Sequence, residues 1–222
     1  MAFENFLELM DTLLGEEGCP WDREQTHESL RQYLLEECYE TIEAIDNRDM
    51  ASLQEELGDV FLQVVFHAKL AERAGAFDID DVITGVAHKL VSRHTHVFGK
   101  DTAASAADVI DVWEANKQKE RKLSLADSMK AVPKALPALV RAAKVIKRSG
   151  ANKPATEDIF KSLHDLLSHL EESNSDNFEV FGKLLFQLVG LSVNLEINAE
   201  FSLTNAIEGF ITTSSESPAT DG

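Results

Sequence analysis

Apolar residues recur at helical spacing along almost the whole chain, and no convincing run alternates apolar and polar positions as a half-buried strand would. The pattern predicts an all-α protein. Its expected helices cover residues 2–15, 27–46, 49–74, 78–94, 105–121, 138–149, 156–171, 178–198 and 203–212. Polar residues at helix starts are the expected N-terminal caps: Thr26, Asp49 or Ser52, Asp78 or Asp80, and Ser105 with Asp108.

A stretch that contains two prolines interrupts the helical pattern near the middle of the chain. This stretch, residues 122–137, is typical of a linker. It separates a first helical module, residues 1–121, from a second one, residues 138–212. The last residues, 213–222, are small and polar, and this composition predicts disorder.

The two halves of the chain share a degenerate repeat. Residues 58–65 match residues 182–189 at an offset of 124, and the same offset relates residues 76–79 to 200–203. One offset that links two separate helices indicates an internal duplication. Allowing one residue of slippage for the first three, Glu36, Glu37, Glu40, Glu56 and Asp59 stand opposite Lys161, Ser162, Asp165, Val180 and Lys183. We therefore expect two tandem modules, of which the second is degenerate: it keeps the packing and has lost the acids.

The overall charge limits the partners of this chain. The net charge is −18 over 222 residues, and such a surface repels a phosphate backbone, so no nucleic acid is expected. A small polyphosphate can bind only where cations reverse the field locally. No apolar run reaches the roughly 18 residues of a membrane-spanning helix, so no membrane partner is expected. The N-terminus does not resemble a signal peptide and two cysteines are too few for a disulfide framework, which makes the cytoplasm the expected compartment.

Four acids are spaced as two facing pairs. Glu37 with Glu40, and Glu56 with Asp59, are each three residues apart and therefore share a helix face. A turn at residues 47–49 lets the two helices run antiparallel, so the pairs can face each other. Four converging carboxylates repel one another unless they are protonated or bound to a cation. Oxygen ligands without His or Cys suit Mg²⁺, with Mn²⁺ as the alternative.

Other interpretations of these residues compete with a magnesium site. Ordinary surface salt bridges would give the same acid spacing, although Gly58 argues against them. A glycine inside a helix costs about 1 kcal/mol, and close approach of two helices is one compensation. A di-iron site needs two Glu-x-x-His motifs, and only residues 24–27 fit. A zinc site from Cys19, His94 and His96 lacks the usual ligand spacing.

Several short motifs resemble the MazG family of all-α nucleotide pyrophosphohydrolases. The family carries Glu-Glu-x-x-Glu followed, after a short spacer, by Glu-x-x-Asp. The similar segments here are residues 18–26, 36–40, 56–59 and 93–98. The resemblance covers the first module strongly and the second weakly. It implies a MazG-like helical bundle that hydrolyses nucleoside triphosphates to nucleoside monophosphate and pyrophosphate, as nucleotide-pool housekeeping.

The resemblance also implies roles for the acids. Glu37, Glu40, Glu56 and Asp59 would coordinate Mg²⁺. Glu36, at the first position of the motif, would orient or deprotonate the attacking water. The expected catalytic acids are therefore Glu36, Glu37 and Glu40.

Two further pairs are implied to bind the substrate. Lys89 and Arg93 would contact the triphosphate, and Trp113 and Lys117 would lie near the base and the phosphates. Each pair is four residues apart, so both side chains can reach one ligand. An ordinary exposed face of basic residues is the alternative interpretation.

A pair of helices on its own buries such a site poorly, so a homodimer is expected. The alternative function is a catalytically weak nucleotide- or metal-binding helical protein that acts through dimerisation. The first module keeps every acid of the motif, which favours the enzyme.

Overall fold

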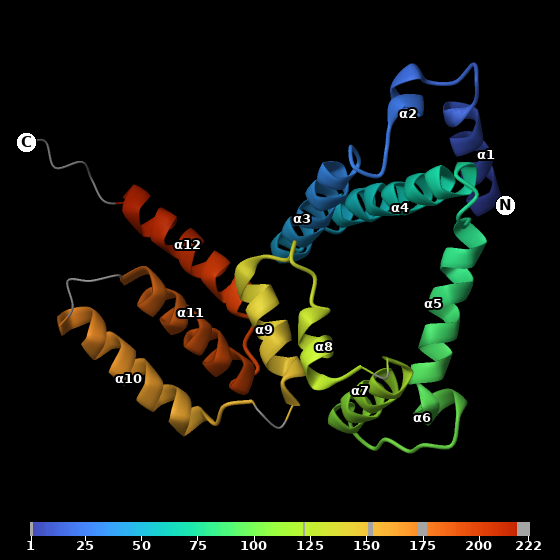
Figure 1. The fold of residues 1–222 in the computed structure, drawn as a ribbon. Helices are drawn as coiled ribbons and strands as arrows, with labels where there is room; N and C mark the ends of the chain where they lie inside the picture. The colour runs from blue at the N-terminus through green and yellow to red at the C-terminus, as the bar shows by residue number, and fades with distance from the viewer. Residues whose placement is uncertain (1, 122, 151–152, 173–176, 217–222) are drawn as a thin grey trace, which may run out of the picture. The chain divides into compact units, whose positions relative to one another are not determined.

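The computed structural model describes residues 2–121, 123–150, 153–172 and 177–216, and every regular element in these ranges is a helix (Figure 1). The all-α prediction is confirmed. The chain divides into two compact units, Met1–Lys117 and Gln118–Gly222. The helices are α1 (Ala2–Leu14), α2 (Pro20–Glu24), α3 (Arg31–Asn47), α4 (Met50–Arg73), α5 (Ile79–Arg93), α6 (Thr95–Phe98), α7 (Ala106–Arg121), α8 (Leu125–Lys130), α9 (Ala138–Arg148), α10 (Thr156–Glu172), α11 (Asn177–Asn194) and α12 (Ala199–Glu216).

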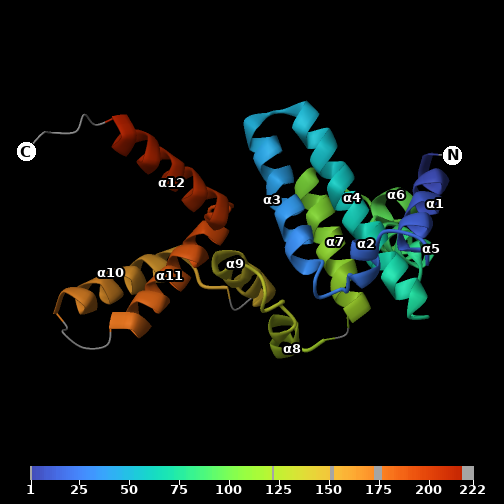
Figure 2. The ribbon, with the colours of Figure 1, turned by 90° about the horizontal axis from the view of Figure 1, so that it is seen from above.

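Helices α3 and α4 form an antiparallel hairpin and lie side by side in both views (Figures 1 and 2). Arg48 ends α3 in the left-handed conformation, with φ of 56°, which lets the chain reverse within two residues. Asp49 then caps α4, because its side chain accepts hydrogen bonds from the amides of Ala51 and Ser52. The short turn holds the first residues of α4 close to the last residues of α3.

The core of the first unit lies where α1 packs on the far half of α4. It is built from Met10, Leu14, Leu30, Val65, Phe66, Ala68 and Ile79. Lys69 joins the two helices, since its Nζ lies 2.7 Å from Asp11 and 3.1 Å from Glu72. The Arg73 guanidinium donates to the carbonyl of Leu14, which satisfies an acceptor at the end of α1.

The next helix, α5, leaves the far end of α4 and runs away from the α3–α4 hairpin (Figure 1). It starts with a capping box in which Asp78 and Asp81 each bond the other's backbone amide. The predicted cap at Asp78 is confirmed. Ser105 and Asp108 form the expected reciprocal bonds at the start of α7.

The start of α3 differs from the prediction. The helix begins at Arg31, with Leu30 as its cap, rather than after Thr26. Thr26 and Ser29 bond each other reciprocally, amide to hydroxyl, at 2.9 and 3.1 Å. They close a single turn that precedes the helix. The predicted loop 15–26 also contains the short helix α2, which Pro20 opens with a backbone angle suited to a first helical position.

The second unit contains a second hairpin, formed by α10 and α11, and the amphipathic helix α9. Two buried clusters hold it together: Ile159, Leu163 and Leu184 between α10 and α11, and Ile146, Val189 and Val193 between α9 and α11. The predicted linker is partly helical, because Ser124 caps α8, and Arg148 of α9 bonds the carbonyl of Ser128 at 2.7 Å.

Helix α12 also differs from the prediction at both ends. Asn198 caps it by accepting from the amides of Glu200 and Phe201, so the helix starts at Ala199, before the expected residue 203. It ends at Glu216, so the first four residues of the tail that was expected to be disordered are helical. Residues 217–222 lie outside the described residues.

The caps refine the proposed repeat. Asp78 caps α5, and Asn198 caps α12 in the same way. The offset of 124 would put the second cap at residue 202, so α12 begins one turn earlier than the offset requires. Lys183, opposite Asp59 in the alignment, has a side chain that is 60% exposed and pairs with Glu179 at 2.5 Å. The duplication itself remains a prediction.

Both units expose apolar residues on their later helices. On α5 these are Val82, Ile83, Val86, Leu90 and Val91, and on α12 they are Phe201, Leu203, Ile207, Phe210 and Ile211. In the part of the chain that is described, no single helix is long and apolar enough to cross a membrane. Only the pair α11 and α12, bent by 107°, meets that criterion by length and composition.

Candidate metal centre and active site

The α3–α4 hairpin brings three of the four predicted metal ligands together. Glu37 comes from α3, and Glu56 and Asp59 come from α4. One carboxylate oxygen from each lies within 4.8 Å of the others, and all three side chains are half-buried. This spacing allows three oxygens to bind one cation. The helix pairing that the acid spacing predicts is therefore present in the fold.

The fourth predicted ligand, Glu40, lies beside this group rather than inside it. Its carboxylate lies close enough to those of Glu37 and Glu56 to raise the pKa of both. Burial, followed by the charges of Asp59, Glu40 and Glu56, raises the pKa of Glu37. Burial and the neighbouring acids, Glu40 first, also raise the pKa of Glu56. A site that holds its acids against their mutual repulsion is suited to a cation, which removes that repulsion.

All the donors in this cluster are carboxylate oxygens, which suits a hard divalent ion such as Mg²⁺ or Mn²⁺. Among the described residues, Glu37, Glu56 and Asp59 are the only group of three or more that could hold a metal. The expected candidates for zinc, Cys19 with His94 and His96, do not form such a group there. The residues 24–27 of the di-iron alternative do not form one either.

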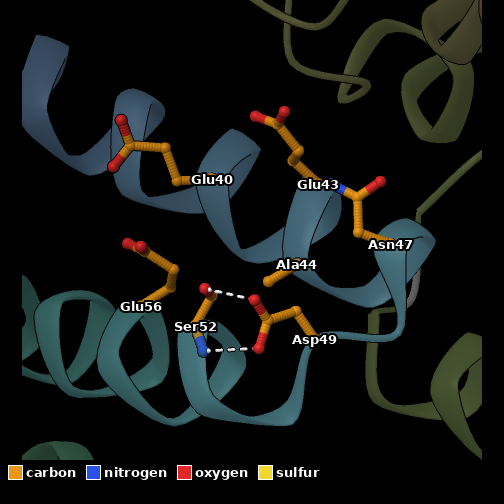
Figure 3. Close-up of a pocket in the computed structure, with 7 residues that line it drawn as sticks. All are labelled: Glu40, Glu43, Ala44, Asn47, Asp49, Ser52 and Glu56. Atoms are coloured by element: carbon orange, nitrogen blue, oxygen red, sulfur yellow. Dashed lines mark hydrogen bonds between the residues drawn. The ribbon is translucent and has the colours of Figure 1, made fainter.

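A hollow of about 320 Å³ adjoins the cluster on the side of the hairpin turn (Figure 3). It is lined by Glu40, Glu43, Ala44, Asn47, Asp49, Ser52 and Glu56. Figure 3 shows Glu40 and Glu56 on opposite walls, one on each helix. Glu43 had not been predicted as part of the site. Its position three residues after Glu40 was the available signal, since that spacing extends the acidic face by one turn.

The remaining predicted acid, Glu36, lies on α3 next to Glu37 and is exposed. Glu37 points into the hairpin. Because successive residues of a helix point about 100° apart, Glu36 points to one side of that direction. The structure therefore places Glu36 at the rim of the cluster.

The predicted substrate-binding residues gather elsewhere, where α5, α6 and α7 meet. The Arg93 guanidinium lies 5.3 Å from the ring centre of Trp113, a cation–π distance. The His94 ring meets the same indole edge-on at 4.8 Å. Asn116 of α7 donates to the Thr95 hydroxyl at 2.8 Å and so ties α7 to α6. The structure thus joins Arg93 with Trp113, and it adds His94, which had been considered only as a ligand of the zinc alternative.

Lys89 and Lys117 lie one turn from Arg93 and Trp113 respectively, on the same two helices. This basic and aromatic group is separated from the acids within the first unit. Asp59 lies about 21 Å, measured along the helix axis, before the end of α4 from which α5 departs. Since α5 then runs away from the hairpin, one chain does not bring the two predicted halves of the site together (Figure 1).

The fold and the cluster define a class: an all-α protein whose candidate active site is a set of carboxylates facing each other across a helical hairpin. Comparison with known proteins agrees. The profile of the MazG nucleotide pyrophosphohydrolase domain matches residues 25–98, which include every predicted metal ligand.

Relatives match far more of the chain. It is 40% identical over 216 residues to the nucleoside triphosphate pyrophosphohydrolase/pyrophosphatase MazG of Thermotoga maritima, covering 95% of this chain and 83% of that one. It is 37% identical over 207 residues to the nucleoside triphosphate pyrophosphohydrolase of Escherichia coli K12, covering 88% and 78%. A match of 49% over 145 residues to the uncharacterized protein YabN of Bacillus subtilis covers 65% of this chain and 30% of YabN. The chain belongs to the MazG family.

Proposed function

We propose that this protein hydrolyses nucleoside triphosphates, ribo- or deoxyribo-, to the nucleoside monophosphate and pyrophosphate, with Mg²⁺ as cofactor. The observation that carries the proposal is the group formed by Glu37, Glu56 and Asp59, whose oxygens lie within 4.8 Å of one another. The printed names of the Thermotoga and Escherichia relatives support the reaction class. Removal of unwanted nucleotides from the pool is the role that we propose for it.

A divalent cation in this cluster would neutralise phosphate charge and lower the pKa of a bound water. The residues of the chain do the rest. Glu37, Glu56 and Asp59 would hold the cation, with Glu40 beside them as a further ligand. Glu36, at the rim, accepts the proton of the attacking water. The water oxygen bonds to the α-phosphorus, the bond from that phosphorus to the bridging oxygen breaks, and pyrophosphate leaves.

The basic and aromatic group supplies the other half of the proposed site. Lys89, Arg93 and Lys117 would stabilise charge on the phosphates, and Trp113 would stack on the base. In one chain these side chains are remote from the acids. We therefore include a homodimer in the proposal, in which a second copy brings this group over the acids of the first.

Exposed apolar faces support the homodimer. On α4, Leu57, Phe61 and Val64 share a face distinct from that of the acids, and they are 53%, 41% and 39% exposed. The apolar residues of α5 form a second such face. Contiguous apolar surface of this kind marks association sites. In the proposed dimer, a second copy would cover these faces and complete the site.

We place this activity in the cytoplasm, since Cys19 and Cys38 are free thiols that suit a reducing compartment. The alternative is a catalytically weak nucleotide- or metal-binding protein that acts as a dimer. The acidic hollow beside the cluster would suit a protein that only stores a cation.

One assay separates these functions. The purified chain is incubated with each ribo- and deoxyribonucleoside triphosphate, and pyrophosphate and monophosphate are measured with Mg²⁺, with Mn²⁺ and with EDTA. We expect equal amounts of both products, only when a divalent cation is present. Release of inorganic phosphate and a nucleoside diphosphate would contradict the proposed bond cleavage. Binding of nucleotide without turnover would favour the alternative.

A further inference from the structure

Gln63 is a buried polar residue with an unsatisfied acceptor. The residue is only 6% exposed, and it lies on α4 next to the core residues Val65 and Phe66. The amide oxygen, Oε1, is buried and has no hydrogen-bond partner among the described residues. Such an atom costs stability unless something else pairs with it, so it usually has a reason.

The position of Gln63 relates it to the acids. It follows Asp59 by four residues and Glu56 by seven, so all three share one face of α4. Across the hairpin, Glu40 is the acid whose charge acts most strongly on Glu56, and Asp59 is the acid whose charge acts most strongly on Glu37. The same antiparallel register sets Tyr33 of α3 opposite Gln63.

Polar side chains continue in this direction along the inside of the hairpin. His27 and His67 meet further on, with their Nδ1 atoms 2.8 Å apart. Tyr33 is half-buried and meets the edge of Trp21 at 5.9 Å. On the other side of the cluster, toward the turn, Asp49 already accepts from the amides that it caps. The unsatisfied acceptor therefore lies on the side away from the turn.

The spacing suits the sugar of a nucleotide. One helical turn separates Asp59 from Gln63, about 6 Å along the axis. An α-phosphate held at the acids is joined to the sugar through the 5′ oxygen and a single methylene, so the sugar can reach that distance. A sugar hydroxyl is a hydrogen-bond donor, which is the partner that Oε1 lacks.

We propose that Gln63 is a specificity residue that accepts a hydrogen bond from a hydroxyl of the substrate's sugar. This inference rests on the proposed function, since it requires a nucleotide with its phosphates at the acid cluster. It gives the unsatisfied acceptor a partner in the complex that the free protein does not supply.

The test combines Gln63→Leu with substrates that lack one hydroxyl. Adenosine triphosphate, its 2′-deoxy form and its 3′-deoxy form are compared by kcat/KM. Removing the contacted hydroxyl is expected to cost the wild type about tenfold, and to cost Gln63→Leu almost nothing further. The variant is expected to lose about tenfold on the full substrate, while its melting temperature stays level or rises because a buried unpaired oxygen is gone.

Gln187→Leu is the matched control, since Gln187 stands opposite Gln63 in the repeat alignment. It should leave the preference among the three substrates unchanged. Equal hydroxyl dependence in wild type and Gln63→Leu would overturn the inference. So would a loss that follows the amino group of the base, tested with inosine triphosphate, rather than a hydroxyl.

Failure of the proposed function would look different. In that case the wild type would not turn over any triphosphate. Binding of a non-hydrolysable adenosine triphosphate analogue and its 2′- and 3′-deoxy forms, measured by calorimetry with Ca²⁺, then decides the inference. The same selective loss in Gln63→Leu would support the sugar contact, and equal or absent binding would exclude it.

Discussion

The two helical hairpins of this protein, α3–α4 and α10–α11, pack their helices through different side chains. In the α10–α11 hairpin, Ile159 and Leu163 pack on Leu184, and this contact is buried. In the α3–α4 hairpin, the space between the helices away from the turn is occupied by Glu37, Glu56 and Asp59 instead. The α3–α4 hairpin therefore has acids at the point where the α10–α11 hairpin has most of its apolar packing. It regains its core only beyond the acids, where α1 covers α4.

A carboxylate site lowers the stability of the hairpin that carries it. Burial and mutual repulsion raise the pKa of both Glu37 and Glu56, so without a cation the hairpin is strained electrostatically. Lys183 in the other hairpin is exposed and paired with Glu179, and it causes no such strain. We therefore expect function to depend on the first hairpin and stability to depend more on the second.

The largest expected effect comes from removing one ligand. Glu56→Gln keeps the size of the side chain and removes its charge, so cation binding and turnover should fall by about a hundredfold or more. The measurement is pyrophosphate release at saturating Mg²⁺, with circular dichroism to verify the helices.

Asp165→Asn is the control for that variant, because Asp165 stands opposite Glu40 in the repeat and is exposed. Its turnover should equal that of the wild type. A comparable loss in both variants would mean that the second hairpin takes part in catalysis, and the contrast between the hairpins would fail.

A smaller effect is expected in the pH dependence of stability without metal. The folded-state pKa of Glu37 and Glu56 is raised above the ordinary value of 4.5. The native state therefore holds these protons more tightly than the unfolded chain does, and the resulting stability is fully present below that value. It is lost as the pH rises through the raised pKa values. Urea midpoints should accordingly fall more steeply toward neutral pH in the wild type than in Glu37→Gln.

Magnesium should remove this difference in slope, because a bound cation replaces the protons. Other acids act in the opposite sense: hydrogen bonds from Ser52 and Ala51 lower the pKa of Asp49, for example. The comparison with Glu37→Gln isolates the cluster from them. Parallel slopes in the two proteins without metal would show that the cluster is not under electrostatic strain.

Much of this could be predicted from the sequence, because the determining interactions are local. Asp49 and Asp78 cap their helices through bonds to amides two or three residues away. Glu56 and Asp59 share a face through spacing alone. The predicted start of α3 at residue 27 was wrong, because Thr26 bonds Ser29 in a separate turn that precedes the helix.

Features that depend on contacts between distant parts of the chain could not be predicted from the sequence. The separation of Arg93 from the acids depends on the direction in which α5 leaves α4 (Figure 1). The missing partner of Gln63 depends on what surrounds it in the fold. The suggestion that Gly58 allows a close approach of helices was wrong for the single chain, since a Cβ there would meet nothing within 4 Å.

The smallest expected effect uses that glycine to connect the hairpins with the proposed dimer. Gly182 stands opposite Gly58 in the repeat, and a Cβ would meet nothing within 4 Å at either position. Helix propensity alone predicts that alanine stabilises each helix by about 1 kcal/mol. We expect Gly182→Ala to show this gain in stability in urea unfolding, and we expect Gly58→Ala not to show it. The reason is that Gly58 lies one turn before the exposed Phe61, at the edge of the α4 face that a second copy would cover. Sedimentation should then show weaker self-association for Gly58→Ala alone, whereas equal gains and unchanged association would place the dimer interface on another face.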